Sequence, residues 1–103
     1  MIAREWKGRC PKKHAEGFIK YLYKTGIKDT SKTEGFLGAQ IFNREVNNKV
    51  EIKLITYWVD YDSIKTFAGE KIEKAKLYPK DAKYKVKPDY KVSHYKVEEN
   101  YWI

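Results

Sequence analysis

The sequence predicts an α+β fold whose elements follow the order β-α-β-β-α-β, with an antiparallel sheet that carries both helices on one face. Four stretches have the alternation or composition of strands, and two stretches between them have the apolar spacing of helices. A chain of 103 residues can bury one modest core, so residues 1–103 are expected to form a single domain. Apolar residues make up 42% of the chain, enough for a folded protein although 35% of the residues are charged.

The first strand is predicted over residues 1–9, where Ile2, Arg4 and Trp6 share one face. This alternation offers a cation and an indole to an interior or an interface. An edge strand explains the same pattern equally well: Trp6 would then cover the rim of the core, and Arg4 would pair with a carboxylate. Both interpretations stay open at this point.

The first helix is predicted over residues 11–25, because Pro11 suits an early helical position and Gly26 suits a left-handed stop. Its apolar positions follow helical spacing, and lysines take the opposite side. His14 lies near the apolar edge of this helix. It is either an acid or base in a cavity or, more commonly, a partly exposed surface histidine.

An antiparallel hairpin is predicted next. Residues 36–44 resume the strand pattern, and an asparagine-containing turn at residues 45–49 leads into a strand at residues 50–59. This last strand is rich in β-branched and aromatic residues and carries only two charges, which indicates burial over much of both faces. The small residues Gly38 and Ala39 indicate close approach by another backbone or by a ligand.

A second helix is predicted to begin at Asp60 or Asp62, which can cap it, and to end before Pro79. Its apolar stripe consists of Ile64, Phe67, Ala68, Ile72 and Ala75. Gly69 interrupts it and can permit a bend or leave room for a bound group. Residues 78–88 form a lysine-rich connection, and residues 90–97 alternate as a last strand. The apolar tail at residues 100–103 is expected to pack on this chain or on a partner.

Charge and cysteine content limit the partners and the compartment. The net charge of +8 raises the question of nucleic acid, but the lysines are scattered and no basic helix or RNA-binding strand motif is present. Specific nucleic-acid binding is therefore not favoured, and a solvated lysine surface is the plainer interpretation. The single Cys10 excludes an internal disulfide. No apolar run reaches the roughly 20 residues of a membrane span and no signal segment is seen, so the cytoplasm is expected.

The predicted order of elements is the ferredoxin-like plan, which leaves one face of the sheet open. Packing that face against a second copy is the usual solution, and alternating apolar residues on four strands supply enough surface for it. A symmetric homodimer is therefore expected. Nine tyrosines and three tryptophans suit half-wet surfaces such as cavity walls and subunit interfaces.

Over most of its length the chain resembles the antibiotic biosynthesis monooxygenase superfamily of dimeric α+β barrels, in particular a subgroup of small uncharacterised members. The resemblance is carried by residues 1–4 (MIAR), 33–36 (TEGF), 55–58 (ITYW) running into 63–67 (SIKTF), and 92–97 (VSHYKV). These motifs are specific to the fold and only weakly specific to a chemistry, because the superfamily also contains haem-degrading and isomerase-like members.

The resemblance implies a pocket between the sheet and the helices for a small planar aromatic or quinol substrate, oxidised by O₂ without flavin, metal or other cofactor. In that role Arg4 would stabilise an oxyanion and His94 would take the proton. The pocket would be lined by Trp6, Trp58, Phe67 and Tyr78. Each also has a structural interpretation: Trp58 and Phe67 as plain core, and His94 as a hydrogen-bonded strand histidine.

The haem-degrading branch of the superfamily fits the sequence poorly. Its members place an asparagine on the first strand, where residues 2–9 have none, and a tryptophan and a histidine ligand on the second helix. Phe67 and Lys76 stand at or near those helical positions, and lysine is protonated at neutral pH. The sequence has no phosphate-binding loop and no nucleophile elbow, and its two histidines, His14 and His94, make only a weak metal site. Two hypotheses remain: a cofactor-independent monooxygenase, or a non-catalytic dimeric ligand-binding or structural protein of the same fold.

Overall fold

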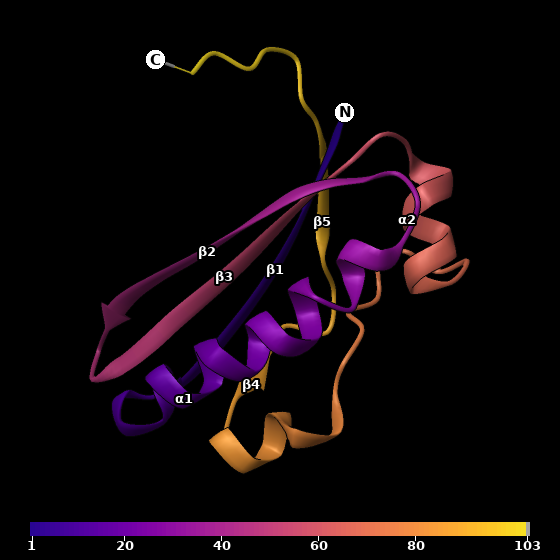
Figure 1. The fold of residues 1–103 in the computed structure, drawn as a ribbon. Coiled ribbons are helices and arrows are strands. Elements are labelled where there is room, and N and C mark those ends of the chain that lie inside the picture. The colour runs from indigo at the N-terminus through magenta and orange to yellow at the C-terminus, as the bar shows by residue number, and fades with distance from the viewer. Residues whose placement is uncertain (103) are drawn as a thin grey trace.

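The computed structural model describes residues 1–102, apart from the side chain of Pro79, and contains one antiparallel sheet with helices packed on one face (Figure 1). The strands are β1 Ile2–Pro11, β2 Phe36–Val46, β3 Lys49–Trp58, β4 Lys87–Pro88 and β5 Ser93–Lys96. They lie in the order β2-β3-β1-β4, and β5 pairs with β1 as well. This is the ferredoxin-like arrangement that the sequence predicts.

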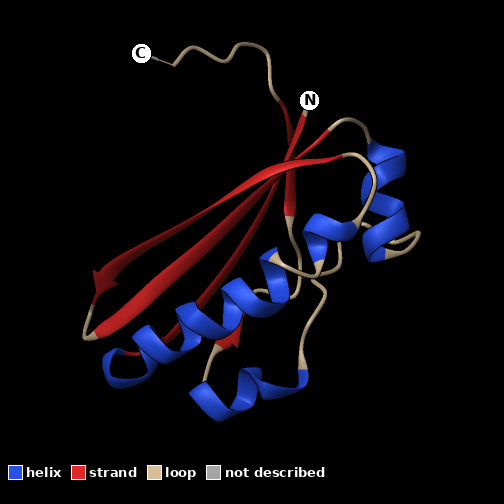
Figure 2. Cartoon of the chain, in the orientation of Figure 1, coloured by secondary structure: helices blue, strands red, loops and turns tan. Residues whose placement is uncertain are grey.

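The helical elements connect the strands along the chain, and Figure 2 shows them on one side of the sheet. They are α1 Lys12–Leu22, a π-helical turn Tyr23–Ile27, a short 3₁₀ turn Thr30–Lys32, α2 Tyr61–Ala68 and a 3₁₀ helix Pro79–Tyr84. Asp60 caps α2 as expected, since its carboxylate accepts a hydrogen bond of 2.9 Å from the Ser63 amide.

Strands β1 and β3 form the centre of the sheet. They pair without a break from Ile2 opposite Trp58 to Pro11 opposite Lys49. Along both strands every second residue is buried, because one sheet face meets the helices and the other does not. Asn47 and Asn48 join β2 to β3 with positive φ angles of 49° and 67°, as a two-residue hairpin turn requires.

The second helix is shorter than the apolar spacing predicts. It ends at Ala68, because Gly69 adopts a φ of 92° and a ψ of 177°, a conformation open essentially to glycine alone. Ile72 and Ala75 therefore lie in an irregular segment, yet both pack against the core. These two residues have the spacing of a helix because both are needed to cover the core, not because the segment is helical.

Other boundaries also differ from the prediction. Cys10 and Pro11 continue β1 instead of breaking it, so that α1 begins at Lys12. Gly26 lies inside the π-helical turn and has no positive φ, so it is not a left-handed stop. The last strand covers only four of the eight predicted residues, and the lysine-rich connection contains a 3₁₀ helix and β4.

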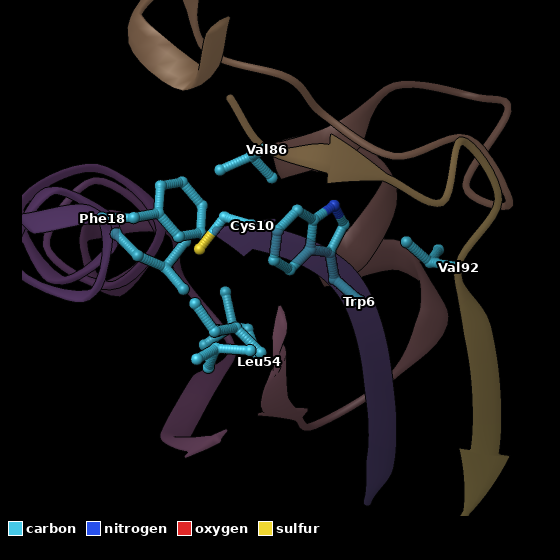
Figure 3. Packing of buried hydrophobic residues seen from close by; sticks show 9 residues of the cluster. Trp6, Cys10, Phe18, Leu54, Val86 and Val92 are labelled. Carbon is cyan, nitrogen blue, oxygen red and sulfur yellow. The ribbon is translucent and has the colours of Figure 1, made fainter. Parts of the chain in front are cut away.

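The core has two parts on the same sheet face. The larger part joins β1, β3, α1 and the segments after α2, and Figure 3 shows Trp6, Phe18 and Val92 in it. The smaller part consists of Ile2, Trp58 and Ile64. Along β1 and β3, Arg4 and Thr56 stand between the two parts, directly opposite one another. A polar layer therefore divides the core.

The C-terminal tail does not pack on this chain. Tyr101 is 82% exposed and Trp102 is 70% exposed, and Figure 1 shows the last segment running away from the body of the molecule. Ile103, which belongs to the predicted tail, lies outside the described residues. Of the two expected positions for this tail, packing on a partner remains.

Three glycines permit a test of the loop conformations. At Gly35 the φ angle is 94°, and an alanine Cβ would lie only 1.9 Å from Ser63 Oγ. At Gly69 the φ angle is similar, 92°, but no atom lies within 4 Å of the Cβ position. At Gly38 the Cβ position is equally free and φ is not positive. Gly69→Ala should lower the free energy of unfolding by about 1–3 kcal/mol. Gly35→Ala should lower it further, and Gly38→Ala should be near neutral. Urea unfolding gives the order, and equal values for Gly35→Ala and Gly38→Ala would contradict it.

The open space around Gly38 bears on one part of a sequence interpretation, close approach by another segment of this chain. No atom of the described chain, its immediate neighbours apart, comes within 4 Å of a Cβ built there, so the small residue does not reflect close approach by another segment. Gly38 instead follows an irregularity in the pairing of β2 with β3, between Phe36 and Gly38.

Candidate functional site

A small cavity of about 50 Å³ lies where the polar layer divides the core, between the sheet and the helical segments. Its apolar wall consists of Trp6, Phe18, Leu22, Leu54, Phe67 and Val92. Its polar wall consists of Arg4, Thr30, Thr56, Lys76, Tyr78 and Asp81, together with the backbone at Gly26. Planar and aliphatic surface on one side and several hydrogen-bonding groups on the other make a binding site of ordinary composition.

Arg4 is the most deeply buried charge of the site, at 5% exposed. Its Nη1 donates to the Ile72 carbonyl and lies 3.0 Å from His94 Nε2, and its Nη2 donates to the Lys74 carbonyl at 3.1 Å. Burial lowers the pKa of Arg4 to about 10, so the guanidinium is still charged at neutral pH. Arg4 thereby ties the irregular segment after α2 to the centre of the sheet.

His94 lies on β5 directly opposite Arg4. Because arginine can only donate, the His94 Nε2 must accept from it, and the ring proton then sits on Nδ1. Burial and the charge of Arg4 lower the pKa of His94, although the nearby Glu73 raises it somewhat. His94 is therefore neutral at neutral pH, and its ring edge packs against Tyr61 at 6.0 Å between centroids.

Lys76, Tyr78 and Asp81 approach the cavity from the segment that follows α2. The Lys76 ammonium lies 4.4 Å from the Phe67 ring centroid and 3.9 Å from Asp29, and the Tyr78 hydroxyl donates to Asp29 at 3.2 Å. Burial is the main cause that raises the pKa of Tyr78, which keeps the phenol neutral. The contacts with Asp29 join this segment to the chain just after the π-helical turn Tyr23–Ile27, which continues α1.

Asp81 accepts a hydrogen bond of 3.2 Å from the Tyr78 amide through Oδ2. Burial raises the pKa of Asp81, and the amide contact lowers it by a smaller amount. A carboxyl group at a cavity wall with its pKa moved toward neutrality can accept a proton from a weak acid. Asp81 therefore has the chemistry of a general base.

The structure brings four of the six predicted site residues to this cavity: Arg4, Trp6, Phe67 and Tyr78. Trp58 and His94 are not among the residues that line it. Trp58 is 0% exposed and packs between Phe36 and Phe67, while its Nε1 donates to Thr56 at 2.9 Å, so its contacts are those of a core residue. The partly buried His14 on α1 is not at the cavity either.

Sequence reasoning missed Thr56, Lys76 and Asp81 as cavity residues. Thr56 could have been found, because it is a polar residue in register with the buried Leu54 and Trp58 on an otherwise apolar strand face. Lys76 lies in an irregular segment and Asp81 in a single short 3₁₀ helix, and no pattern of spacing in the sequence points to either. Among the described residues, no helix is long and apolar enough to cross a membrane.

This geometry defines a ferredoxin-like α+β domain with a cavity between its sheet and its helical layer. No protein-family model matches the sequence, and neither does any curated protein. Solved structures do match it. A proposed antibiotic biosynthesis monooxygenase from Bacillus cereus has a TM-score of 0.70 at 15% identity, with 100% of this chain and 96% of its own chain covered.

Two further structures show the breadth of this likeness. A dimeric ferredoxin-like protein from an uncultured marine organism has a TM-score of 0.65 at 14% identity, with 100% of both chains covered. A variant of MhuD with two manganese protoporphyrin IX molecules bound per active site has a TM-score of 0.63 at 14% identity, with 99% of both covered. The resemblance found in the sequence is thus confirmed at the level of the fold, the ferredoxin-like fold of antibiotic biosynthesis monooxygenase-like proteins.

Proposed function

We propose that this protein is a cofactor-independent monooxygenase that acts on a small planar aromatic or quinol substrate. The observation that carries the proposal is the charged, aromatic-walled cavity between sheet and helices, which holds Arg4 and Asp81 in one space. The same fold occurs in proposed antibiotic biosynthesis monooxygenases, which supports this reaction class. Fold alone does not fix a reaction, so the residues of the cavity have to supply the chemistry.

The side chains suit oxidation of an acidic CH₂ or phenol by O₂. Asp81 takes a proton from the substrate, and the guanidinium of Arg4 stabilises the resulting oxyanion. The electron-rich anion then reduces O₂, so that a CH₂ group becomes C=O, one oxygen atom enters the product and the other leaves as water. His94 positions Arg4, since its Nε2 is already engaged as an acceptor and must be released before it can act as a base.

Substrate entry requires movement of the segment at residues 69–78. The cavity of about 50 Å³ is far below the roughly 300 Å³ of typical small-molecule sites. Two contacts with Asp29 hold the segment closed, one from Lys76 and one from Tyr78. The side chains of Lys76 and Asp29 are 41% and 49% exposed, so their ion pair contributes little. The larger cost of opening lies in the hydrogen bonds from Arg4 to the Ile72 and Lys74 carbonyls.

Haem does not fit this site, although the likeness to a porphyrin-binding MhuD variant raises the question. Lys76 at the cavity wall is engaged by the Phe67 ring at 4.4 Å and by Asp29 at 3.9 Å. The nearest imidazole, His94, gives its Nε2 lone pair to Arg4. None of these groups offers a free axial ligand.

Oxygen consumption tests the proposal. Purified protein is mixed with a panel of anthrones, naphthols and quinols in an oxygen electrode, and products are analysed by mass spectrometry after incubation in labelled O₂. We expect enzyme-dependent oxygen uptake with at least one class, and one labelled oxygen atom in the product. Absence of enzyme-dependent uptake across the panel would refute the reaction, provided that circular dichroism shows folded protein.

The small cavity volume favours one alternative, a non-catalytic dimeric protein that binds a small ligand. Trp6, Leu54 and Phe67 occupy much of the space between sheet and helices. In that case a planar ligand would bind saturably, as measured by calorimetry, and no member of the panel would cause enzyme-dependent oxygen uptake. The two assays together separate the alternatives.

A homodimer through the open sheet face completes the proposal. On this face Phe42 is 46% exposed and lies opposite Lys53, and a hollow of about 410 Å³ runs beside Phe42 and Ile55. The dimeric ferredoxin-like protein from the marine organism supports such an assembly. A second copy would cover Phe42 and Ile55, together with the charged residues Arg44, Glu51 and Lys53 that line the same hollow.

Phe42→Glu should convert the dimer to a monomer, because it replaces an exposed aromatic side chain of the proposed interface with a charge. Sedimentation velocity measures the change, and Lys20→Glu on α1, far from the open face, serves as the control. Wild-type protein that sediments as a monomer at all concentrations would contradict the homodimer.

A further inference from the structure

Arg4 is a buried cation without a buried anion. None of the six ion pairs in the described part of the chain includes it, although it is 5% exposed. Its hydrogen-bond partners are two backbone carbonyls and a neutral imidazole. Removing a charge from water costs several kcal/mol unless an opposite charge compensates it, and neutral acceptors compensate only in part.

The guanidinium also has more donors than its three contacts use. Within the described residues no acceptor meets its Nε–H, and no fully buried side-chain nitrogen or oxygen lacks a partner. The Nε–H of Arg4 must therefore reach open space, and the cavity is the open space that Arg4 lines. Nε and Nη2 together form the kind of planar pair of donors that fits two oxygens of one carboxylate.

Thr56 adds a donor at the same place. It lies directly opposite Arg4 on β3, lines the cavity and is 5% exposed. Its Oγ1 accepts from Trp58 Nε1 at 2.9 Å, which leaves its O–H to donate, and no acceptor for it is found among the described residues. Cross-strand neighbours have Cβ atoms roughly 5 Å apart, close enough for one small group to contact both side chains.

The rest of the wall agrees with an anionic, planar ligand. Lys76 adds a second positive charge, so that two cations, Arg4 and Lys76, stand against one carboxyl group, Asp81, among the described residues of the wall. Trp6 and Phe67 offer aromatic faces to the body of a ligand. The space of about 50 Å³ suits a carboxylate-sized head group, with the ligand body reaching toward the segment of Lys76.

We propose that the cavity binds a planar aromatic monoanion whose charged oxygens contact Arg4 and Thr56. The charged group is a carboxylate or an ionised enol or phenol. This assignment rests on the proposed function and deepens it, because it names the class of substrate that the same site selects. An aromatic acid should bind more tightly than its neutral analogue of equal shape, and the cationic analogue should not bind.

The probes are benzoate, its neutral analogue benzamide and the cation benzylamine, titrated by calorimetry into the full chain. We expect benzoate to bind at least about tenfold more tightly than benzamide, the discrimination that a charge-assisted hydrogen-bonded pair supplies, and benzylamine not to bind. Equal binding of benzoate and benzamide, or no binding of benzoate, would overturn the assignment.

Variants locate the contact. Arg4→Met should weaken benzoate binding by about tenfold to a hundredfold, and Thr56→Val by about three- to tenfold. Arg9→Met is the matched control: Arg9 lies on the same strand but on the other sheet face, where it pairs with Asp89 at 2.9 Å, so binding should not change. Unchanged binding in both Arg4→Met and Thr56→Val would place the ligand elsewhere and refute the proposal.

Two further measurements cover a variant that fails to fold and separate this proposal from the proposed function. Should Arg4→Met fail to fold, Arg4→Lys retains the charge without the planar pair of donors, and its benzoate binding should still fall severalfold. Oxygen consumption separates the two proposals. Benzoate binding without any oxygen uptake would leave the anion site standing and remove the oxygenase, whereas oxygen uptake without any benzoate binding would remove the anion site and leave the oxygenase.

Discussion

Replacing Trp58 with alanine should lower the free energy of unfolding by about 3–5 kcal/mol, the range measured for large-to-small changes in protein cores. Trp58 is 0% exposed and packs at 5.6 Å and 5.8 Å, between ring centroids, from Phe36 and Phe67. Its indole Nε1 also donates a hydrogen bond to Thr56 Oγ1 at 2.9 Å. The smaller part of the core contains only two other buried side chains, Ile2 and Ile64, so little can move in to fill the space.

Urea unfolding followed by circular dichroism measures this loss. Trp102→Ala is the matched control, because the same residue type at 70% exposed on the tail should change stability by less than about 0.5 kcal/mol. A loss this large is a substantial share of the roughly 5–15 kcal/mol that stabilises a typical domain. Similar stabilities for the two variants would show that Trp58 is not the centre of this part of the core.

Asp81→Asn should reduce the rate of oxygen uptake on the best substrate by about 100- to 10,000-fold, the usual contribution of a general base. Asparagine has nearly the same shape, and its carbonyl can still accept the hydrogen bond from the Tyr78 amide that Asp81 accepts at 3.2 Å. The variant should therefore fold normally. The expected loss is in the chemical step and not in the binding of the substrate.

The pH dependence provides an independent readout. Burial raises the pKa of Asp81 above the ordinary aspartate range, and a base acts only when it is deprotonated. The wild-type rate should therefore rise with pH through that raised pKa, and this limb should vanish in Asp81→Asn. Asp89→Asn, which removes an exposed partner of Arg9, is the control. A full rate in Asp81→Asn would transfer the role of base to another group.

The central strands and the hairpin could be predicted because their signals are local. Alternating burial on β1 and β3 follows from one face meeting the helices, and Asn47 and Asn48 fit the left-handed turn by their own conformational preference. Arg4 was a candidate because it shares a face with Ile2 and Trp6, and its burial confirms that it belongs to the interior. The carboxylate partner considered for it is not found among the described residues.

The segment after α2 could not be predicted for a physical reason. Ile72 and Ala75 are buried by contacts with distant strands, and such contacts leave the same apolar spacing as a helix. Only the conformation of Gly69 decides that α2 stops. Lys76 and Asp81 reach the cavity because this irregular chain folds back over it, and long-range placement of that kind leaves no periodic trace in the sequence.

The position of the bound ligand tests the whole account most directly. Trp6 lines the cavity and Trp102 lies on the exposed tail, so their phenylalanine variants report where a quenching ligand sits. Fluorescence is recorded during titration with a planar aromatic acid, while calorimetry confirms that each variant still binds. We expect quenching to fall sharply in Trp6→Phe, with the remainder coming from Trp58 beside Thr56 and Phe67, and to persist in full in Trp102→Phe. Quenching that is unchanged in Trp6→Phe and lost in Trp102→Phe would show that the ligand does not occupy the cavity between sheet and helices.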